Sequence, residues 1–496
     1  MVRHNPSGYR LYPALILLAL LAGCGGGGGS NNGATPPAST APTLVSLTVT
    51  PVQPTINVGG TVQLSASGAY SDGTKAAVTT GLSWSSSTNS ATVVTSSGLV
   101  TGAKIGNATV SATVGAVSGG TKVTVQGEFI GIAAAGGHTA AVKAGGTLFG
   151  WGSNRLGQLG DATLADRLAP TQIGSIATWK FVAGGQFHTA AIRADGSLWT
   201  WGYNQNGQLG DGTFVNRLVP TQESTKDTGW VAVSAGGAHT LAIKKDGTLW
   251  AWGRNLNGQL GDGTNVDKAA PTPIGVKTPV VTDAAGKAIA NVWNSVSAGA
   301  SHSCARLQAN AVVYCWGSNN RGQLGNSTTT DANLPAAVQT AAGNFVAVAV
   351  AAGGFHTLAI AADGSLYAWG ANEFGQLGLG TSVDATTARQ VFPSTNTYNW
   401  AIVAGGDRHS LAIDSDGNLW AWGSNLWGQL GDNTETDRPL PTLIGRDTWY
   451  AISAGESHTA AIRSDGTLWT WGYNQTGQLG LGSLDRLFVP APTLLP

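Results

Sequence analysis

The sequence predicts an all-β protein, in which a small β-sandwich is followed by a seven-bladed β-propeller. One motif of about 50 residues occurs seven times in the C-terminal three quarters of the chain, and alternating apolar and polar residues separated by turn residues fill the remainder. The composition agrees, because 72 Gly and 18 Trp among 496 residues, with only 10% charged residues, suit many tight turns around a packed core.

The first residues have the pattern of an export signal. Arg3 and Arg10 precede an apolar run, 11–21, that is shorter than the roughly 20 residues needed to span a bilayer. The run ends in Leu21-Ala22-Gly23-Cys24, which resembles the lipobox of bacterial lipoproteins. The resemblance implies a signal peptide at 1–23 and a lipid on Cys24; the alternative is an ordinary signal peptide with Cys24 there by chance.

Residues 24–43 are rich in Gly, Ser, Thr and Pro and predict a flexible tether. We therefore expect a protein of the bacterial cell envelope, at the outer membrane or the cell surface, that contacts the membrane through its lipid anchor only.

Residues 44–126 predict the sandwich. Short alternating segments such as Val62-Gln63-Leu64-Ser65-Ala66 recur with turn residues about every ten positions. This segment resembles the group 2 bacterial immunoglobulin-like domain, which implies an immunoglobulin-like β-sandwich acting as a spacer or an adhesion module. The segment contains no Cys, and Trp84 is expected to be an ordinary core residue.

Residues 127–496 hold the repeats. The motif Trp-Gly-x-Asn-x-x-Gly-Gln-Leu-Gly starts at Trp151, Trp201, Trp252, Trp316, Trp369, Trp422 and Trp471. A His precedes each copy: His138, His188, His239, His302, His356, His409 and His458. Between His and Trp lie two alternating segments, usually joined by Asp-Gly, which predicts a hairpin with positive φ at both central residues. A longer gap after Trp252 predicts an insertion near 276–290.

Such a unit cannot bury its faces alone, whereas stacking small sheets around an axis can. The motif resembles the regulator of chromosome condensation repeat, and the resemblance implies a seven-bladed propeller. The last copy is followed by a Pro-containing segment, 490–495, whereas the first copy begins at Phe129 with no such segment before it. We therefore expect the C-terminus to complete the first blade and close the ring.

Residues present in every copy are best explained by packing. We expect the seven His to be buried and hydrogen-bonded within or between blades, and the seven Gln of the motif to satisfy backbone groups of the turn. We predict no cofactor, no metal site and no catalytic residues. One alternative stays open, since Asp407, Glu456 and Glu373 lie at variable positions and could converge as paired carboxylates.

Variable positions predict a partner-binding face. They lie within the motif turns and just before the His, and hold aromatic residues and Arg, which dominate binding hot spots. The first group is Arg155, Tyr203, Arg254, Arg321, Phe374, Trp427 and Tyr473, and the second is Phe187, Phe355 and Arg408. Trp427, which fits no scaffold position, is expected to be the most exposed Trp of the propeller. The alternative is that these side chains cover the edges of neighbouring blades.

Two cysteines are expected to form a disulfide. Cys304 and Cys315 lie on the two arms of the fourth hairpin, and export would place them in an oxidising compartment. Two buried free thiols are the alternative.

The charge balance argues against nucleic-acid binding. Lys+Arg and Asp+Glu number 26 each, and removal of residues 1–23 takes away two Arg and no acid, which leaves a net charge of −2. We expect a monomeric, non-enzymatic binding protein for an unknown protein or surface macromolecule. One alternative is an inhibitor of an extracellular or periplasmic hydrolase, as the resemblance to a secreted β-lactamase-inhibiting propeller with related repeats would allow. Another is guanine-nucleotide exchange, which is known for the family's nuclear founder. The last is an enzymatic propeller.

Overall fold

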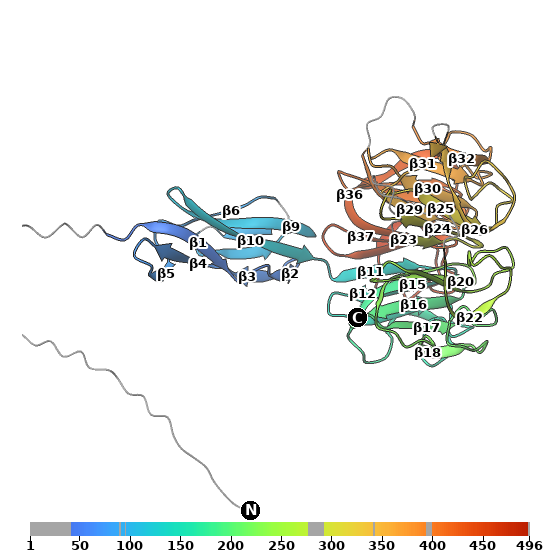
Figure 1. The fold of residues 1–496 in the computed structure, drawn as a ribbon, viewed down its shortest axis with the longest axis horizontal. Coiled ribbons are helices and arrows are strands. Elements are labelled where there is room, and N and C mark those ends of the chain that lie inside the picture. Colours follow the sequence, from blue (N-terminus) through green and yellow to red (C-terminus); the bar gives the residue numbers. More distant parts are fainter. Residues whose placement is uncertain are drawn as a thin grey trace, which may run out of the picture. The chain divides into compact units, whose positions relative to one another are not determined.

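The computed structural model describes residues 41–88, 91–94, 96–275, 292–340, 343–392 and 399–494, and all their regular elements are β-strands (Figure 1). Within these ranges, no helix is long and apolar enough to cross a membrane. The expected signal peptide, Cys24, most of the tether and the insertion near 276–290 lie outside the described residues.

Ten strands between Leu44 and Gln126 form the predicted sandwich. They are β1 (Leu44–Thr50), β2 (Thr55–Asn57), β3 (Thr61–Gln63), β4 (Ser65–Tyr70), β5 (Lys75–Val78), β6 (Ser83–Ser86), β7 (Ala91–Val94), β8 (Leu99–Gly102), β9 (Gly106–Val114) and β10 (Val117–Gln126). The sheets have the orders β1-β4-β5, β2-β10-β9-β6 and β3-β8-β7. Alternate residues of β9 and β10 face the core, where Trp84 is buried as expected.

The remaining strands form seven four-stranded antiparallel blades. Blades 1 to 3 are β11 (Phe129–Ala134), β12 (His138–Lys143), β13 (Leu148–Gly152) and β14 (Arg167–Gln172); β15 (Trp179–Gly184), β16 (His188–Arg193), β17 (Leu198–Gly202) and β18 (Arg217–Gln222); β19 (Trp230–Ala235), β20 (His239–Lys244), β21 (Leu249–Gly253) and β22 (Lys268–Pro273). Blades 4 and 5 are β23 (Trp293–Ala298), β24 (His302–Leu307), β25 (Val313–Gly317) and β26 (Ala332–Ala337); β29 (Ala349–Ala352), β30 (His356–Ile360), β31 (Leu366–Gly370) and β32 (Ala385–Gln390). A short hairpin, β27 (Gln339–Thr340) with β28 (Gly343–Asn344), lies between these two blades in the chain.

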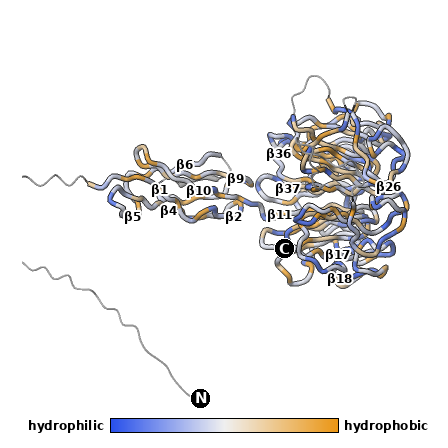
Figure 2. The backbone as a smooth tube through the Cα atoms, viewed as in Figure 1, coloured by the Kyte–Doolittle hydropathy of each residue, from blue (hydrophilic) through white to orange (hydrophobic). Residues whose placement is uncertain are grey.

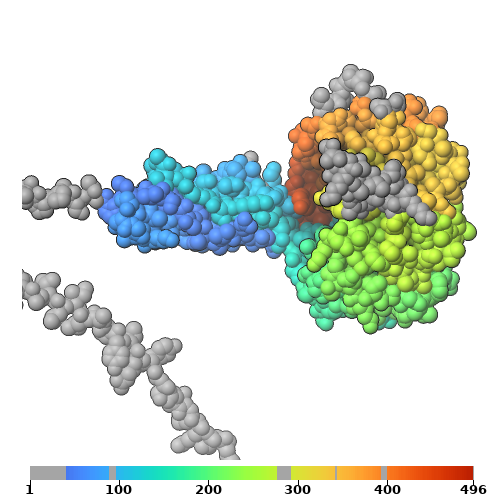
Figure 3. Space-filling model, viewed as in Figure 1, coloured from blue at the N-terminus to red at the C-terminus, as the bar shows by residue number. Residues whose placement is uncertain are grey.

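Blades 6 and 7 share one long strand. They contain β33 (Trp400–Gly405), β34 (His409–Asp414), β35 (Asn418–Gly423), β36 (Arg438–Ala454), β37 (His458–Arg463), β38 (Leu468–Gly472) and β39 (Leu487–Pro492). The first part of β36 pairs with β35, and its last part pairs with β37. In Figure 3 the sequence colours follow one another around the propeller from green through yellow and orange to red, so consecutive blades are neighbours.

The predicted closure of the ring by the C-terminus is wrong. Strand β39 pairs with β38 of its own blade, and the first blade has its own outer strand, β14. In every copy the outer strand, which contains Pro in all blades except blade 5, belongs to the motif that it follows, so no strand is left over at the C-terminus. Side chains and backbone groups join blade 7 to blade 1 instead, as described below.

The hairpins exist as predicted, but their turn type differs. In blade 2 the Gly196 amide donates to the Arg193 carbonyl, and Arg193 and Ser197 pair beyond it. Gly196 has a φ of 81°, whereas Asp195 is not among the residues with positive φ. The loop is therefore a three-residue connection, in which a type I turn precedes one left-handed Gly. Asp195 contributes through its carboxylate, which accepts from the Ser197 amide at 2.9 Å.

The propeller core lies between the blades. The seven Trp that start the motifs are all fully buried. Figure 2 shows hydrophobic stretches of chain inside the propeller. In blade 2 the buried Trp179 packs edge-on against both Trp199 and Trp201. Equivalent aromatic contacts recur in blades 3 to 7. Trp179 and Trp201 also pack with Val142 and Leu148 of blade 1, so neighbouring blades bury their faces against each other.

Candidate functional site

A hydrogen-bonded chain joins each blade to the next through the repeated His. Between blades 1 and 2, His138 Nε2 lies 2.8 Å from Thr189 Oγ1, and this hydroxyl donates to the Gln158 carbonyl at 2.7 Å. The single hydroxyl proton of Thr189 is used in the bond to Gln158, so this hydroxyl accepts from His138. His138 therefore carries its ring proton on Nε2. The indole of the motif Trp adds a donor at six of the seven junctions, as Trp252 does to the Gln208 carbonyl at 3.0 Å.

This arrangement keeps the histidines neutral. Burial lowers the pKa of every repeated His from 6.5 to about 3 or about 4. All seven Nε2 atoms bond a Thr or Ser hydroxyl of the following blade, and His458 of blade 7 bonds Thr139 of blade 1. The expected structural role of the His is thus present in the structure.

The seven Gln side chains cap the motif turns, also as expected. Each accepts from the backbone amide two residues earlier, as Gln208 does from Asn206 at 3.0 Å. The same bond is present in the other six copies.

Backbone hydrogen bonds run around the propeller axis just before the histidines. The amide of the residue two before each His donates to a carbonyl of the next blade, as Gln186 does to Gly236 at 3.2 Å. The amide of Glu456 donates to the Ala135 carbonyl at 3.1 Å and thereby joins blade 7 to blade 1. Since only the backbone of this residue is used, its side chain is free to vary.

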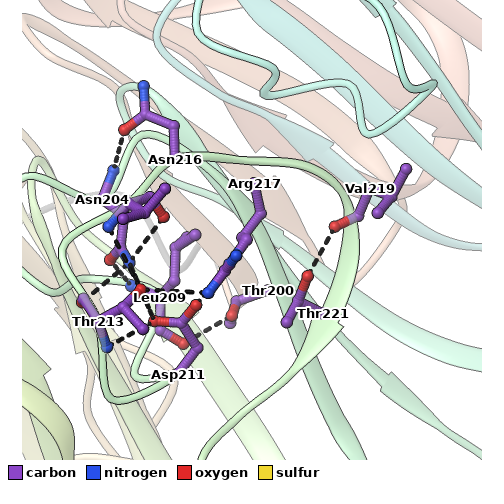
Figure 4. Close-up of polar contacts among 10 residues, drawn as sticks. Thr200, Asn204, Leu209, Asp211, Thr213, Asn216, Arg217, Val219 and Thr221 are labelled. Carbon is purple, nitrogen blue, oxygen red and sulfur yellow. Dashed lines mark hydrogen bonds and ion pairs between the residues drawn. The ribbon is translucent and has the colours of Figure 1, made fainter.

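The long loop after each motif Trp is held by its own polar network (Figure 4). In blade 2, Asn204 donates to the Asp211 carboxylate at 3.1 Å, and Arg217 pairs with the same carboxylate at 2.6 Å. Equivalent pairs of Asp with Arg or Lys occur in blades 1, 3 and 6. This pair was not predicted, although its two positions change together among the copies: blades 4, 5 and 7 lack both the Asp and the cation.

The two groups of variable positions lie at the same end of every blade. The residue after Trp-Gly donates its amide to the carbonyl of the residue before the His, as Tyr203 does to Phe187 at 2.9 Å. All seven blades have this bond. The residues before the His precede one strand, the motif loop follows the next, and these two strand ends pair with each other, as His188 and Gly202 do in blade 2. We call this end of the propeller the loop face; it comprises the seven motif loops and the three residues before each His.

The predicted binding residues fall into two classes. Arg155, Phe187, Phe355 and Arg408 are exposed, and the two Phe side chains are 38% and 36% exposed. The others, Tyr203, Arg254, Arg321, Phe374, Trp427 and Tyr473, are half-buried. Several of these are engaged within the protein, since Phe187 contacts Tyr203 edge-on and Phe374 lies beneath the Arg408 guanidinium.

The expectation that Trp427 has no scaffold role is wrong. Trp427 packs edge-on against Tyr473 of the next blade, at 4.9 Å between ring centroids, and Arg486 lies 5.7 Å from its ring. The same position in blade 4 holds Arg321, which pairs with Asp384 of blade 5 at 2.5 Å. This position in the motif therefore contacts the next blade, as the alternative interpretation proposed. Trp427 is also only half-buried, like Trp199, Trp250, Trp420 and Trp469.

The channel mouth, at the centre of the loop face, forms a cavity of about 430 Å³. Small residues from all seven blades line it, together with Gln186, Arg254, Phe355, Asp407 and Glu456. Burial raises the pKa of Asp407, and the charge of Glu373 adds to the shift. Burial followed by the charge of Asp407 raises the pKa of Glu456. The charge of Glu373 thus acts on Asp407, and the charge of Asp407 acts on Glu456, so the three carboxylates lie near one another. Within the described ranges, no three His, Cys, Asp or Glu side chains form a group that could hold a metal ion.

Exposed apolar side chains on the loop face were not anticipated. Eight of them on the motif loops are more than half exposed: Leu164, Phe214, Val215, Leu256, Val266, Val383, Leu426 and Leu484. Because most lie ten or eleven residues after the motif Asn, comparison of the copies at that distance would have shown them.

Cys304 and Cys315 form the disulfide that the sequence predicts. They are directly opposed on β24 and β25, and both are fully buried.

Comparison with known proteins agrees with this architecture. The family described as the regulator of chromosome condensation (RCC1) repeat matches residues 145–192, 195–243 and 246–306, and the RCC1-like domain matches 290–496. The propeller is an RCC1 repeat propeller. The bacterial Ig-like domain of group 2 matches residues 44–125.

Two curated relatives each match about two fifths of the chain. The ultraviolet-B receptor UVR8 of Arabidopsis thaliana is 31% identical over 43% of this chain and 45% of the receptor. The RCC2 homolog of Danio rerio is 30% identical over 42% of this chain and 44% of that protein. The chain thus spans less than half the length of these relatives. The likeness to the human ligase HERC2, 32% identical, covers only 6% of that enzyme.

Solved structures share the propeller fold. Human WBSCR16 superposes with a TM-score of 0.62 and 22% identity over 71% of this chain and 94% of that chain. Yeast RCC1 (Prp20), determined with Kap60 bound, gives a TM-score of 0.60 and 22% identity over 70% and 83%. At this level of identity the likeness shows the fold alone.

Proposed function

We propose that the chain is an exported, lipid-anchored, non-enzymatic binding protein whose RCC1 repeat propeller holds a protein partner on its loop face. The observation that carries the proposal is the set of side chains just before the histidines. At these positions the scaffold uses only backbone groups. Four blades have Gly, Ala or Ser immediately before the His, and four have Gly or Ala one residue earlier. Phe187, Phe355 and Arg408 are nevertheless large and exposed.

Aromatic residues and Arg are enriched in interface hot spots, so these exposed side chains suit a binding surface. The exposed apolar residues of the motif loops extend the same surface outward. A propeller of the same fold, yeast RCC1 (Prp20), has been determined with the protein Kap60 bound, which supports a protein as the class of partner.

The proposed location rests on the sequence of residues 1–43. A lipid on Cys24, followed by a flexible tether, would hold the described domains outside the cytoplasm at the cell envelope. Metabolic labelling with a fatty-acid analogue tests this part. The chain should take up the label and fractionate with membranes, and Cys24→Ser should abolish both; a soluble, unlabelled wild-type chain contradicts the anchor.

The binding role is tested by capturing partners from envelope extract with the mature chain. Phe187→Ala with Phe355→Ala should remove the partner while the melting temperature stays within a few degrees. Phe181→Ala with Tyr450→Ala is the matched control, because it removes two exposed aromatic side chains near the opposite ends of the inner strands. Equal capture by both double variants contradicts a binding site on the loop face.

A further inference from the structure

The loop face carries a negative charge that the rest of the propeller lacks. Its residues contain fourteen Asp and Glu against nine Lys and Arg, a net charge of −5. The remaining residues of 127–496 contain eleven acidic and twelve basic residues. The counted segments are the motif loops 153–167, 203–217, 254–268, 318–332, 371–385, 424–438 and 473–487, and the three residues before each His.

The acid excess is not neutralised within the face. In four motif loops one Asp pairs with a cation of its own loop, so these pairs add no net charge. Glu373 and Asp384, however, share the single cation Arg321. Glu456 and Asp485 have no ion pair among the described residues. Field lines from such a surface attract basic partners and repel acidic ones.

The deepest part of the face is also acidic. Asp407 and Glu456 come from adjacent blades and both line the cavity of about 430 Å³ at the channel mouth. Their backbones are fixed by the bond from the Asp407 amide to the Gly455 carbonyl at 3.2 Å. Asp407 has one close cation, Arg408 at 3.3 Å, whose side chain is half exposed. Burial raises the pKa of both carboxylates, and Arg408 is the only cation among the causes of either shift, since the lining residue Arg254 of blade 3 contributes to neither. A bound cation would relieve the cost of burying these two charges.

The cavity has an apolar side as well. Phe355 lines it from blade 5, and most of the remaining lining residues are Gly and Ala. A long side chain with an apolar stem and a charged end fits such a site better than a compact cation does, because the stem can pack on Phe355 while the end reaches the carboxylates.

We propose that the partner of the loop face is a basic protein surface that places a Lys or Arg side chain into the channel mouth between Asp407 and Glu456, while its apolar residues pack on the exposed loop residues. This inference rests on the proposed function and adds the chemical class of the partner. Nucleic acids and anionic lipid surfaces carry the same sign of charge as the loop face and are disfavoured.

The test uses the full mature chain and a dodecapeptide of alternating Lys and Leu as probe, with the matched Glu and Leu peptide as its control. Calorimetric titration should show binding of the basic peptide only. Asp407→Asn with Glu456→Gln should weaken it by about tenfold or more. Asp246→Asn with Asp465→Asn removes the same charge from hairpin turns at the opposite end of the blades and should change the Kd less than about twofold. Equal weakening by both double variants, or binding of the acidic peptide, overturns the inference.

The captured partner separates this inference from the proposed function. If Phe187→Ala with Phe355→Ala abolishes capture but Asp407→Asn with Glu456→Gln leaves it unchanged, the loop face binds a partner that is not recognised through its basic groups, and only the inference fails. If neither double variant affects capture, the proposed function fails too. Loss of capture with both supports the two together.

Discussion

Replacing Thr189 by Val should destabilise the propeller more than the same change at Thr240. Each hydroxyl links a His of the preceding blade to a Gln carbonyl, at His138 and Gln158 for Thr189 and at His188 and Gln208 for Thr240. Valine keeps the shape of the side chain and removes the hydroxyl, so the perturbation is confined to these hydrogen bonds.

The difference comes from the motif Trp. Trp252 also donates to the Gln208 carbonyl, so Thr240→Val leaves only the His188 N–H without a partner. The Trp201 indole N–H has no partner among the described residues, and no other described group donates to the Gln158 carbonyl. A buried polar group left unpaired costs about 1–3 kcal/mol, so Thr240→Val should cost about that amount and Thr189→Val at least about 1 kcal/mol more.

Urea denaturation followed by Trp fluorescence measures both variants. Thr189→Ser is the control, because Ser303 and Ser410 occupy the same position in blades 4 and 6, and it should retain most of the stability. Equal midpoints for the two Val variants, or a Ser variant as unstable as the Val variant, would refute the proposed hydrogen-bond chain.

Four further predictions concern stability. The seven His have a folded-state pKa of about 3 to 4, below the unfolded value of 6.5. As the pH falls from 6.5 towards 4, each His therefore lowers the free energy of unfolding by about 1.4 kcal/mol per pH unit. The melting temperature should drop steeply between pH 6.5 and 5, and a flat profile there contradicts the neutral His. A Cβ at Gly150 would meet Ile173 at 3.4 Å, and equivalent positions of other blades hold Ala251, Ala368 and Ala421, so Gly150→Ala should stabilise the protein by about 0.4–1 kcal/mol. Gly185→Ala should instead lower the melting temperature markedly, because its Cβ would lie 2.4 Å from the His188 ring. The reverse order of stabilities contradicts the packing described. Thiol titration of the unfolded, unreduced mature chain should find Cys304 and Cys315 unreactive. Reduction should cost about 3 kcal/mol, because the bridge removes the loop-closure entropy of the segment between the two Cys from the unfolded state; two free thiols would remove the disulfide. Trp427→Ala should lower stability by more than 1 kcal/mol through loss of the contacts with Tyr473 and Arg486, and an unchanged melting temperature would return Trp427 to the binding surface.

The repeat made most of the fold predictable. Seven copies about 50 residues apart, with one insertion, predict seven equivalent sheets, and residues repeated in all copies, such as the His and Gln, are correctly assigned to the scaffold. The ring closure could not be obtained in this way. A four-stranded unit repeated seven times has the same spacing whichever strand is counted first, so only the strand pairing shows that β39 belongs with β38.

The candidate site was less predictable, because it depends on contacts between different copies. Comparing the copies places Trp427 at a variable position, but it does not show that this position faces the next blade. Arg486, which replaces the Asp or Asn found twelve residues after the motif Asn in the other copies, is the signal that could have paired it with Trp427. The clustering of Asp407, Glu456 and Phe355 likewise requires three separate blades to meet at one axis.

The most direct test of the central claim is partner capture by the mature chain with Phe187→Ala and Phe355→Ala, read against the matched change of Phe181 and Tyr450 to Ala. The account predicts that the first double variant loses the partner with its melting temperature preserved, and that the second retains it. Retention of the partner by the first variant, or equal loss by both, would contradict a binding site on the loop face.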